Sequence, residues 1–140
     1  MAEGIMRKKA ESLKLDAIID SAGTGHWHVG EHPDKRAVQT ADKFGVDISK
    51  LIARQFCEDD FDDFDKIYVM DLSNYYAVID LARSQENKQK VSLLLNADEP
   101  GSNREVPDPY FDKGDGFEKV FHMMEKACDA IASELQMQLK

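Results

Sequence analysis

Two short stretches of this sequence carry side chains that could do chemistry. Asp108 lies between Pro107 and Pro109, and two rigid prolines hold a carboxyl in one place, as a general acid near a leaving group requires. Trp27 lies in a glycine-rich segment, where an exposed indole ring can form one wall of a pocket for a flat substrate group. A turn-forming aspartate and a tryptophan that covers the edge of a sheet are the structural alternatives.

A third stretch, Met70-Asp71-Leu72-Ser73-Asn74, joins a strand-like run to a helix-like one. At the end of a strand, the Asp71 carboxylate is expected to hold loop amides in place. Ser73 is expected to cap the helix that follows. These polar side chains would therefore lie at one edge of the predicted sheet.

Metal and disulfide chemistry is not indicated. His26 and His28 are two residues apart with no third ligand nearby, so exposed loop histidines are the expectation. Cys57 and Cys128 form no C-x-x-C pair, so neither a structural zinc site nor a disulfide scaffold is supported. We expect no metal and no organic cofactor.

The elements that position these residues alternate along the chain. Helical patterns or caps predict helices at residues 2–13, 33–44, 58–65, after Ser73, and from Phe117 onward. Short apolar runs predict strands at 15–20, 66–70 and 91–95. This alternation predicts one three-layer α/β domain over residues 1–140 with a mainly parallel sheet. Ligands of such sheets bind at the carboxyl ends of strands, so the loops after Asp20, Met70 and Leu95 should share one rim.

Composition excludes several classes of protein. The 18 basic and 27 acidic residues give a net charge of −9, which argues against general nucleic-acid binding. No apolar run approaches the ~20 residues needed to cross a bilayer, and residues 1–9 do not form a signal peptide, so a cytoplasmic location is expected. The acidic run at 58–65 is expected to be a solvated face without a ligand.

Taken together, the motifs resemble the low-molecular-weight protein tyrosine phosphatases in order and spacing over nearly the whole chain. The matching strings are Ile19-Asp20-Ser21-Ala22-Gly23-Thr24, Trp27-His28-Val29-Gly30, Pro33-Asp34-Lys35-Arg36-Ala37, Ala53-Arg54-Gln55, Asp60-Phe61 with Phe64-Asp65, Val69-Met70-Asp71-Leu72-Ser73-Asn74 and Val106-Pro107-Asp108-Pro109-Tyr110. The resemblance implies a flavodoxin-like α/β fold with a four-stranded parallel sheet. It also implies hydrolysis of a phosphotyrosine protein or an aryl phosphate through a phosphocysteine intermediate.

Site residues follow from the resemblance position by position. It implies that Asp108 is the general acid and that Trp27 and Tyr110 line the phosphotyrosine entrance. The residues that match a segment bordering the active site are Asp71, Ser73 and Asn74.

One element of that family is expected to be absent. A C-x5-R-[ST]-P loop between the first strand and the first helix supplies the thiolate nucleophile and a phosphate-binding arginine. This sequence starts at Met1-Ala2-Glu3-Gly4, which resembles the helix after that loop, so we expect it to lack the first, central strand, the nucleophile and the arginine. Cys57 has acidic neighbours and no arginine at the required spacing, and Cys128 lies on an apolar helical stripe. We therefore expect no turnover.

Losing a central strand would forfeit on the order of 10 kcal/mol of apolar burial, comparable to the stability of a whole domain. We therefore expect either a rearranged sheet or strand exchange between chains, which would make a homo-oligomer. A non-catalytic binding or interaction module that reuses the fold is the alternative function. An arsenate reductase shares the fold, but it needs the same nucleophile and a resolving cysteine pair.

Overall fold

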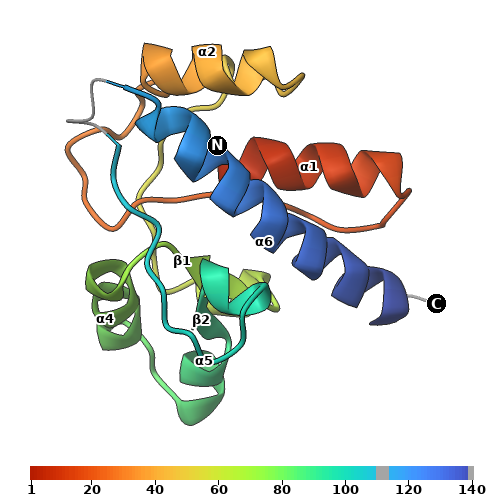
Figure 1. Cartoon of the computed structure of the whole chain (residues 1–140). Helices are drawn as coiled ribbons and strands as arrows, with labels where there is room; N and C mark the ends of the chain where they lie inside the picture. The colour runs from red at the N-terminus through yellow and green to blue at the C-terminus, as the bar shows by residue number, and fades with distance from the viewer. Residues whose placement is uncertain (110–113, 139–140) are drawn as a thin grey trace.

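The computed structural model describes residues 1–109 and 114–138 (Figure 1). Its elements in chain order are α1 (Ala2–Ser12), α2 (Lys35–Lys43), α3 (Asp60–Asp63), β1 (Ile67–Val69), α4 (Leu72–Asp80), α5 (Gln85–Gln89), β2 (Val91–Leu93), a 3-10 turn η1 (Leu94–Ala97) and α6 (Gly116–Gln138). Tyr110 lies outside the described residues.

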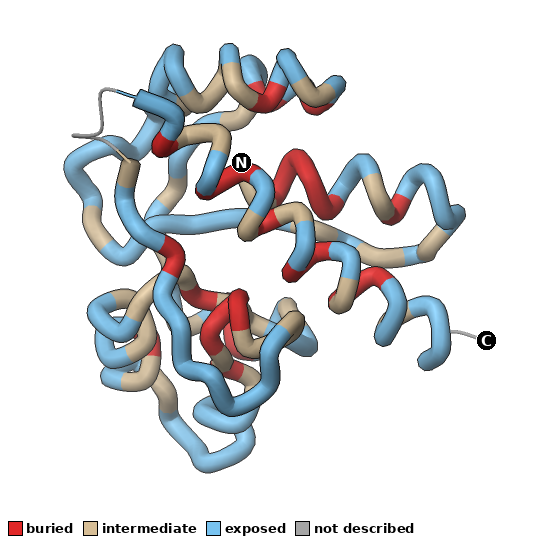
Figure 2. Tube along the Cα trace, viewed as in Figure 1, coloured by how far each residue is buried: buried red, intermediate tan, exposed pale blue. Residues whose placement is uncertain are grey.

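The largest apolar cluster lies between α1 and α6. Buried positions recur along α6 and in the N-terminal half of α1 (Figure 2). Ile5 and Met6 of α1 belong to the same cluster as Phe121 and Met124 of α6. The helical periodicity of the sequence predicts both helices, and the structure confirms them.

A glycine sets how closely α1 approaches the segment after α2. A Cβ atom built on Gly4 would lie 2.4 Å from Cγ2 of Ile48 and 2.9 Å from Cγ1 of Val46. Real carbon atoms do not pack at such distances, so this position of α1 has no room for a side chain.

β1 and β2 form a parallel pair in which Ile67 lies beside Val91. Alternate residues of β1 serve different faces: Tyr68 packs on the α1–α6 cluster, whereas Val69 joins a second cluster that includes Val78 of α4. The sheet therefore lies between the α1–α6 pair and α4 (Figure 1), as a three-layer α/β arrangement requires.

The expected strand at 15–20 does not form within the described part of the chain. Leu15 and Ile19 pack on the α1–α6 cluster, but no strand pairs with this segment, and Ile18 is 88% exposed. A ladder needs a neighbour for its backbone groups, and the one parallel bridge found near it joins Gly23 to Gln55.

Two smaller expectations about elements are also wrong. The N-cap of α4 is Asp71, which accepts a hydrogen bond from the Asn74 amide, so Ser73 does not cap this helix. β2 ends at Leu93, because the chain turns into η1 before Leu95.

Candidate functional site

A cavity of about 500 Å³ lies where the first turn of α4 meets the segment 104–108. Its lining residues are Asp71, Ser73, Arg104, Glu105, Val106, Pro107 and Asp108. The fold thus brings Asp108 to the turn that follows β1, although 37 positions separate Asp108 from Asp71 (108 minus 71). Asn74 is not a lining residue, but its amide binds the carboxylate of Asp71, which is one.

Two hydrogen bonds join the two walls of this cavity, and a third lies within the α4 wall. The Val106 amide donates to the carbonyl of Met70 (2.8 Å), so the residue that follows β1 is joined to the opposite wall. The Leu72 amide donates to Oε1 of Glu105 (2.8 Å). Within α4, the Asn74 amide donates to Oδ1 of Asp71 (2.8 Å). The first turn of α4 has amides without helical partners, and these two carboxylates satisfy two of them.

Three of the seven lining residues of the cavity are acidic and one is basic. Asp71, Glu105 and Asp108 each bring a carboxyl group, and Arg104 brings one guanidinium, which pairs with Glu99 (2.9 Å). Asp108 is exposed at this surface. A carboxyl group in this place can exchange a proton with a bound ligand, which is the chemistry required of a general acid or base.

Trp27 is placed in an exposed loop and does not line that cavity. Its ring is 76% exposed and stacks on His26, with 5.1 Å between ring centroids. A Cβ atom on Gly25 would lie 1.9 Å from Cζ3 of Trp27, so the indole ring lies directly over this glycine. His28 pairs with Glu31 in the same loop (2.6 Å). Within residues 1–109 and 114–138, no group of three or more side chains has the geometry to hold a metal ion.

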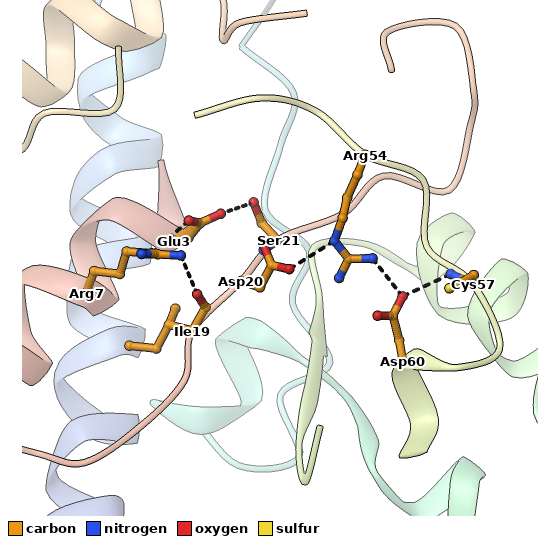
Figure 3. A network of polar contacts seen from close by, with 8 residues as sticks. All are labelled: Glu3, Arg7, Ile19, Asp20, Ser21, Arg54, Cys57 and Asp60. Carbon is orange, nitrogen blue, oxygen red and sulfur yellow. Dashed lines mark hydrogen bonds and ion pairs between the residues drawn. The ribbon is translucent and has the colours of Figure 1, made fainter. Parts of the chain in front are cut away.

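A polar network links segments that are distant in sequence (Figure 3). Arg54 donates from Nε to Asp20 (3.0 Å) and from Nη1 to Asp60 (3.0 Å), and Asp60 also accepts from the Cys57 amide (2.9 Å). Beside Asp20, the Ser21 hydroxyl donates to the buried carboxylate of Glu3 (2.5 Å). The segment before the Trp27 loop is thereby tied to both α1 and α3.

Asp60 corrects the expectation that the whole acidic run is solvated, because only 4% of it is exposed. Burial opposes its ionisation, but the hydrogen bonds from Arg54 and the Cys57 amide outweigh burial and lower the pKa of Asp60. The pKa of Arg54 is raised in turn, mainly because its side chain hydrogen-bonds to Asp60. One signal could have revealed the pair: Arg54 is the single basic residue between positions 51 and 65.

The two cysteines differ in environment. Cys57 is exposed, and its amide binds Asp60. Cys128 is buried in α6, and burial raises the pKa of its thiol to about 11. Six residues after them, where C-x5-R would place an arginine, the chain has Asp63 and Glu134.

Comparison with known proteins identifies the family. A model described as "Low molecular weight phosphotyrosine protein phosphatase" matches residues 1–140. The chain belongs to this family. A putative low-molecular-weight protein-tyrosine-phosphatase of Synechocystis is 36% identical over 140 residues, covering 99% of this chain and 88% of the relative. The Schizosaccharomyces pombe enzyme of the same family is 40% identical over 120 residues, covering 84% and 76%.

Solved low-molecular-weight phosphatases share the fold. The protein tyrosine phosphatase of Entamoeba histolytica superposes with a TM-score of 0.89 at 32% identity, covering 99% of this chain and 89% of that structure. YfkJ from Bacillus subtilis gives 0.87 at 32% identity, covering 99% and 87%. The expected flavodoxin-like α/β fold with a parallel sheet is therefore confirmed. So close a superposition gives no support to a rearranged sheet. No described helix, the 23-residue α6 included, is apolar enough over sufficient length to span a membrane.

Proposed function

We propose that this chain forms the acid and substrate-binding side of a phosphotyrosine phosphatase site. Asp108 would be the general acid, Trp27 and Tyr110 would line the entrance for the aromatic ring, and Asp71, Ser73 and Asn74 would border the site. The proposal rests on one observation: in a chain of this phosphatase family, Asp108 shares a cavity with the first turn of α4.

In phosphotyrosine hydrolysis, Asp108 would carry out two proton transfers. A cysteine thiolate attacks phosphorus, the bond to the tyrosyl oxygen breaks, and the Asp108 carboxyl gives its proton to that oxygen. The resulting carboxylate then takes a proton from the water that hydrolyses the phosphocysteine. An exposed carboxyl suits both transfers, because phosphotyrosine and water can both reach it.

We further propose that the 140 residues alone do not hydrolyse phosphotyrosine. The pKa of Cys128 is about 11, so its thiol is protonated at neutral pH and is no nucleophile. Cys57 is exposed, but Asp63 stands where a C-x5-R loop would place its arginine. Neither cysteine has the arginine that would bind the phosphoryl group.

Hydrolysis of p-nitrophenyl phosphate tests both proposals. The purified chain should release no more nitrophenol than its Cys57→Ser and Cys128→Ser variants, and cysteine-dependent release would refute inactivity. A fusion that carries the first strand and C-x5-R-[ST]-P loop of a relative before Met1 should hydrolyse p-nitrophenyl phosphate. In that fusion, Asp108→Asn should lower kcat about 10²–10⁴-fold, and an unchanged kcat would exclude Asp108 as the acid. Phosphotyrosine-peptide binding by the unfused chain without turnover would indicate a binding module instead.

We also propose that copies of this chain associate through exchanged strands. The support is Ile18, 88% exposed in a segment that pairs with no strand of the described residues, together with a described sheet of only two strands. Sedimentation equilibrium should show a dimer that Ile18→Lys converts to a monomer. Ile52→Lys, a change at another exposed isoleucine, should leave the mass unaltered. A monomeric parent protein would refute strand exchange.

A further inference from the structure

The loop at residues 23–31 carries Trp27 and is attached at both of its ends to one short segment, 53–56. Four backbone hydrogen bonds make these attachments. Donor first, they are Gly23 N to Arg54 O (2.9 Å), Phe56 N to Gly23 O (2.8 Å), Gly30 N to Ala53 O (2.8 Å) and Ala53 N to Glu31 O (2.8 Å). The loop therefore takes its position from the segment 53–56.

Between these ends, the described residues make few other contacts with the loop, among them a hydrogen bond from Nε2 of Gln55 to the Thr24 carbonyl (3.4 Å). Trp27 stacks on its neighbour His26, His28 pairs with Glu31, and Val29 is exposed. Neither Trp27 nor Val29 belongs to an apolar cluster of the described residues. Aromatic side chains are usually held in place by packing in an apolar cluster. Because Trp27 lacks such packing, the location of its indole ring depends on the attachments at the loop ends.

The segment 53–56 is anchored mainly through Arg54. Ala53 and Gln55 are exposed, and Phe56 packs on the cluster around α4. The guanidinium of Arg54 spans two carboxylates, that of Asp20 just before the loop and the buried one of Asp60 in α3. A planar guanidinium can bind two carboxylates in fixed directions at once, which an ammonium group cannot do equally well.

We propose that Arg54 is a positioning residue for the Trp27 wall of the substrate entrance. It acts through the backbone of 53–56, which it clamps between Asp20 and Asp60, and the loop ends follow that backbone. The role assigned to the wall rests on the proposed function, whereas the control of the loop by Arg54 does not. It is therefore measured on the chain itself, without substrate and without turnover.

Arg54→Gln tests this control. Amide hydrogen exchange at Gly23 and Gly30 should accelerate about tenfold or more, while exchange at Val69 in β1 stays within about twofold. Trp27 is the one tryptophan of the chain, so its fluorescence anisotropy reports loop motion directly and should fall. Arg54→Lys should give an intermediate result. Arg83→Gln, which breaks an exposed pair between Arg83 and Glu58, is the matched control and should change neither readout.

Two results would overturn the proposal. One is unchanged exchange at Gly23 and Gly30 in a folded Arg54→Gln protein. The other is equal acceleration at Val69, which would mean that Arg54 supports the fold as a whole. If Arg54→Gln does not fold, Asp20→Asn removes only the more exposed partner and should accelerate the same two amides by a smaller factor. An inactive fusion protein would leave these measurements unaffected.

Discussion

The α1–α6 layer and the polar network around Arg54 hold this molecule together in different ways. Between α1 and α6, apolar side chains from two long helices share one buried cluster. Around Arg54, loop segments and the short helix α3 are joined by ion pairs and backbone hydrogen bonds. The first region is stabilised by burial, which does not depend on protonation. The second depends on charges, so its contribution should change with pH.

Phe121→Ala should have the largest effect on stability, about 3–5 kcal/mol, because it empties a fully buried site in α6. The ring stacks on Phe44 with centroids 4.9 Å apart, so its loss also removes an aromatic contact. Urea unfolding measures the change. Met137→Ala, at an exposed position of the same helix, should stay within about 0.5 kcal/mol. Similar losses in both variants would contradict a core centred on Phe121.

The two regions also differ in how well the sequence predicts them. The helix of Phe121 and Met124 could be predicted because apolar residues recur at helical spacing. The pair of Asp20 and Arg54 joins positions 34 residues apart, and no local pattern marks such a contact. A short apolar run predicts a strand at 15–20, but a strand needs a partner, which local sequence does not reveal.

The rim of the candidate site was predictable for a different reason. Parallel strands end at one edge of their sheet, and this rule brings Asp108 toward Asp71 without any pairwise signal. The rule does not say which polar residue fills which role. Ser73 and Asp71 are both good capping residues, and only the geometry of the turn selects Asp71.

Asp60→Asn should cost about 2 kcal/mol at neutral pH, because it weakens charge-assisted hydrogen bonds at a buried carboxylate. The pKa of Asp60 is lowered in the folded protein. Its contribution is therefore complete above the pKa of the unfolded chain and disappears as pH falls through the folded pKa. Urea unfolding should show the difference between parent and variant shrinking below about pH 4.

Asp62→Asn in the same helix is the control for Asp60→Asn, because Asp62 is exposed. It should change stability by less than about 0.5 kcal/mol. The loss caused by Phe121→Ala should persist at acidic pH, and this contrast separates the two regions. An Asp60→Asn loss independent of pH would show that shape, and not charge, is what Asp60 contributes.

Gly4→Ala should destabilise by about 1 kcal/mol, although alanine favours a helix by roughly that amount over glycine. The new methyl group would overlap Ile48 and Val46, and overpacking costs about 1–3 kcal/mol. Ile48→Ala makes room, so the double variant should lose less than the sum of the two single losses in urea unfolding. A stabilised Gly4→Ala protein would mean that propensity, and not packing, governs α1.

Asp71→Ala should also cost only about 1 kcal/mol, because it removes one capping bond from α4. Ser73→Ala is the matched test: Ser73 lines the same cavity but is not the cap, so its loss should stay below about 0.5 kcal/mol. Amide exchange at Asn74 should accelerate in Asp71→Ala alone. The reverse order would make Ser73 the cap. It would also mean that the cap of α4 can be predicted from local sequence, unlike the long-range contacts of Arg54.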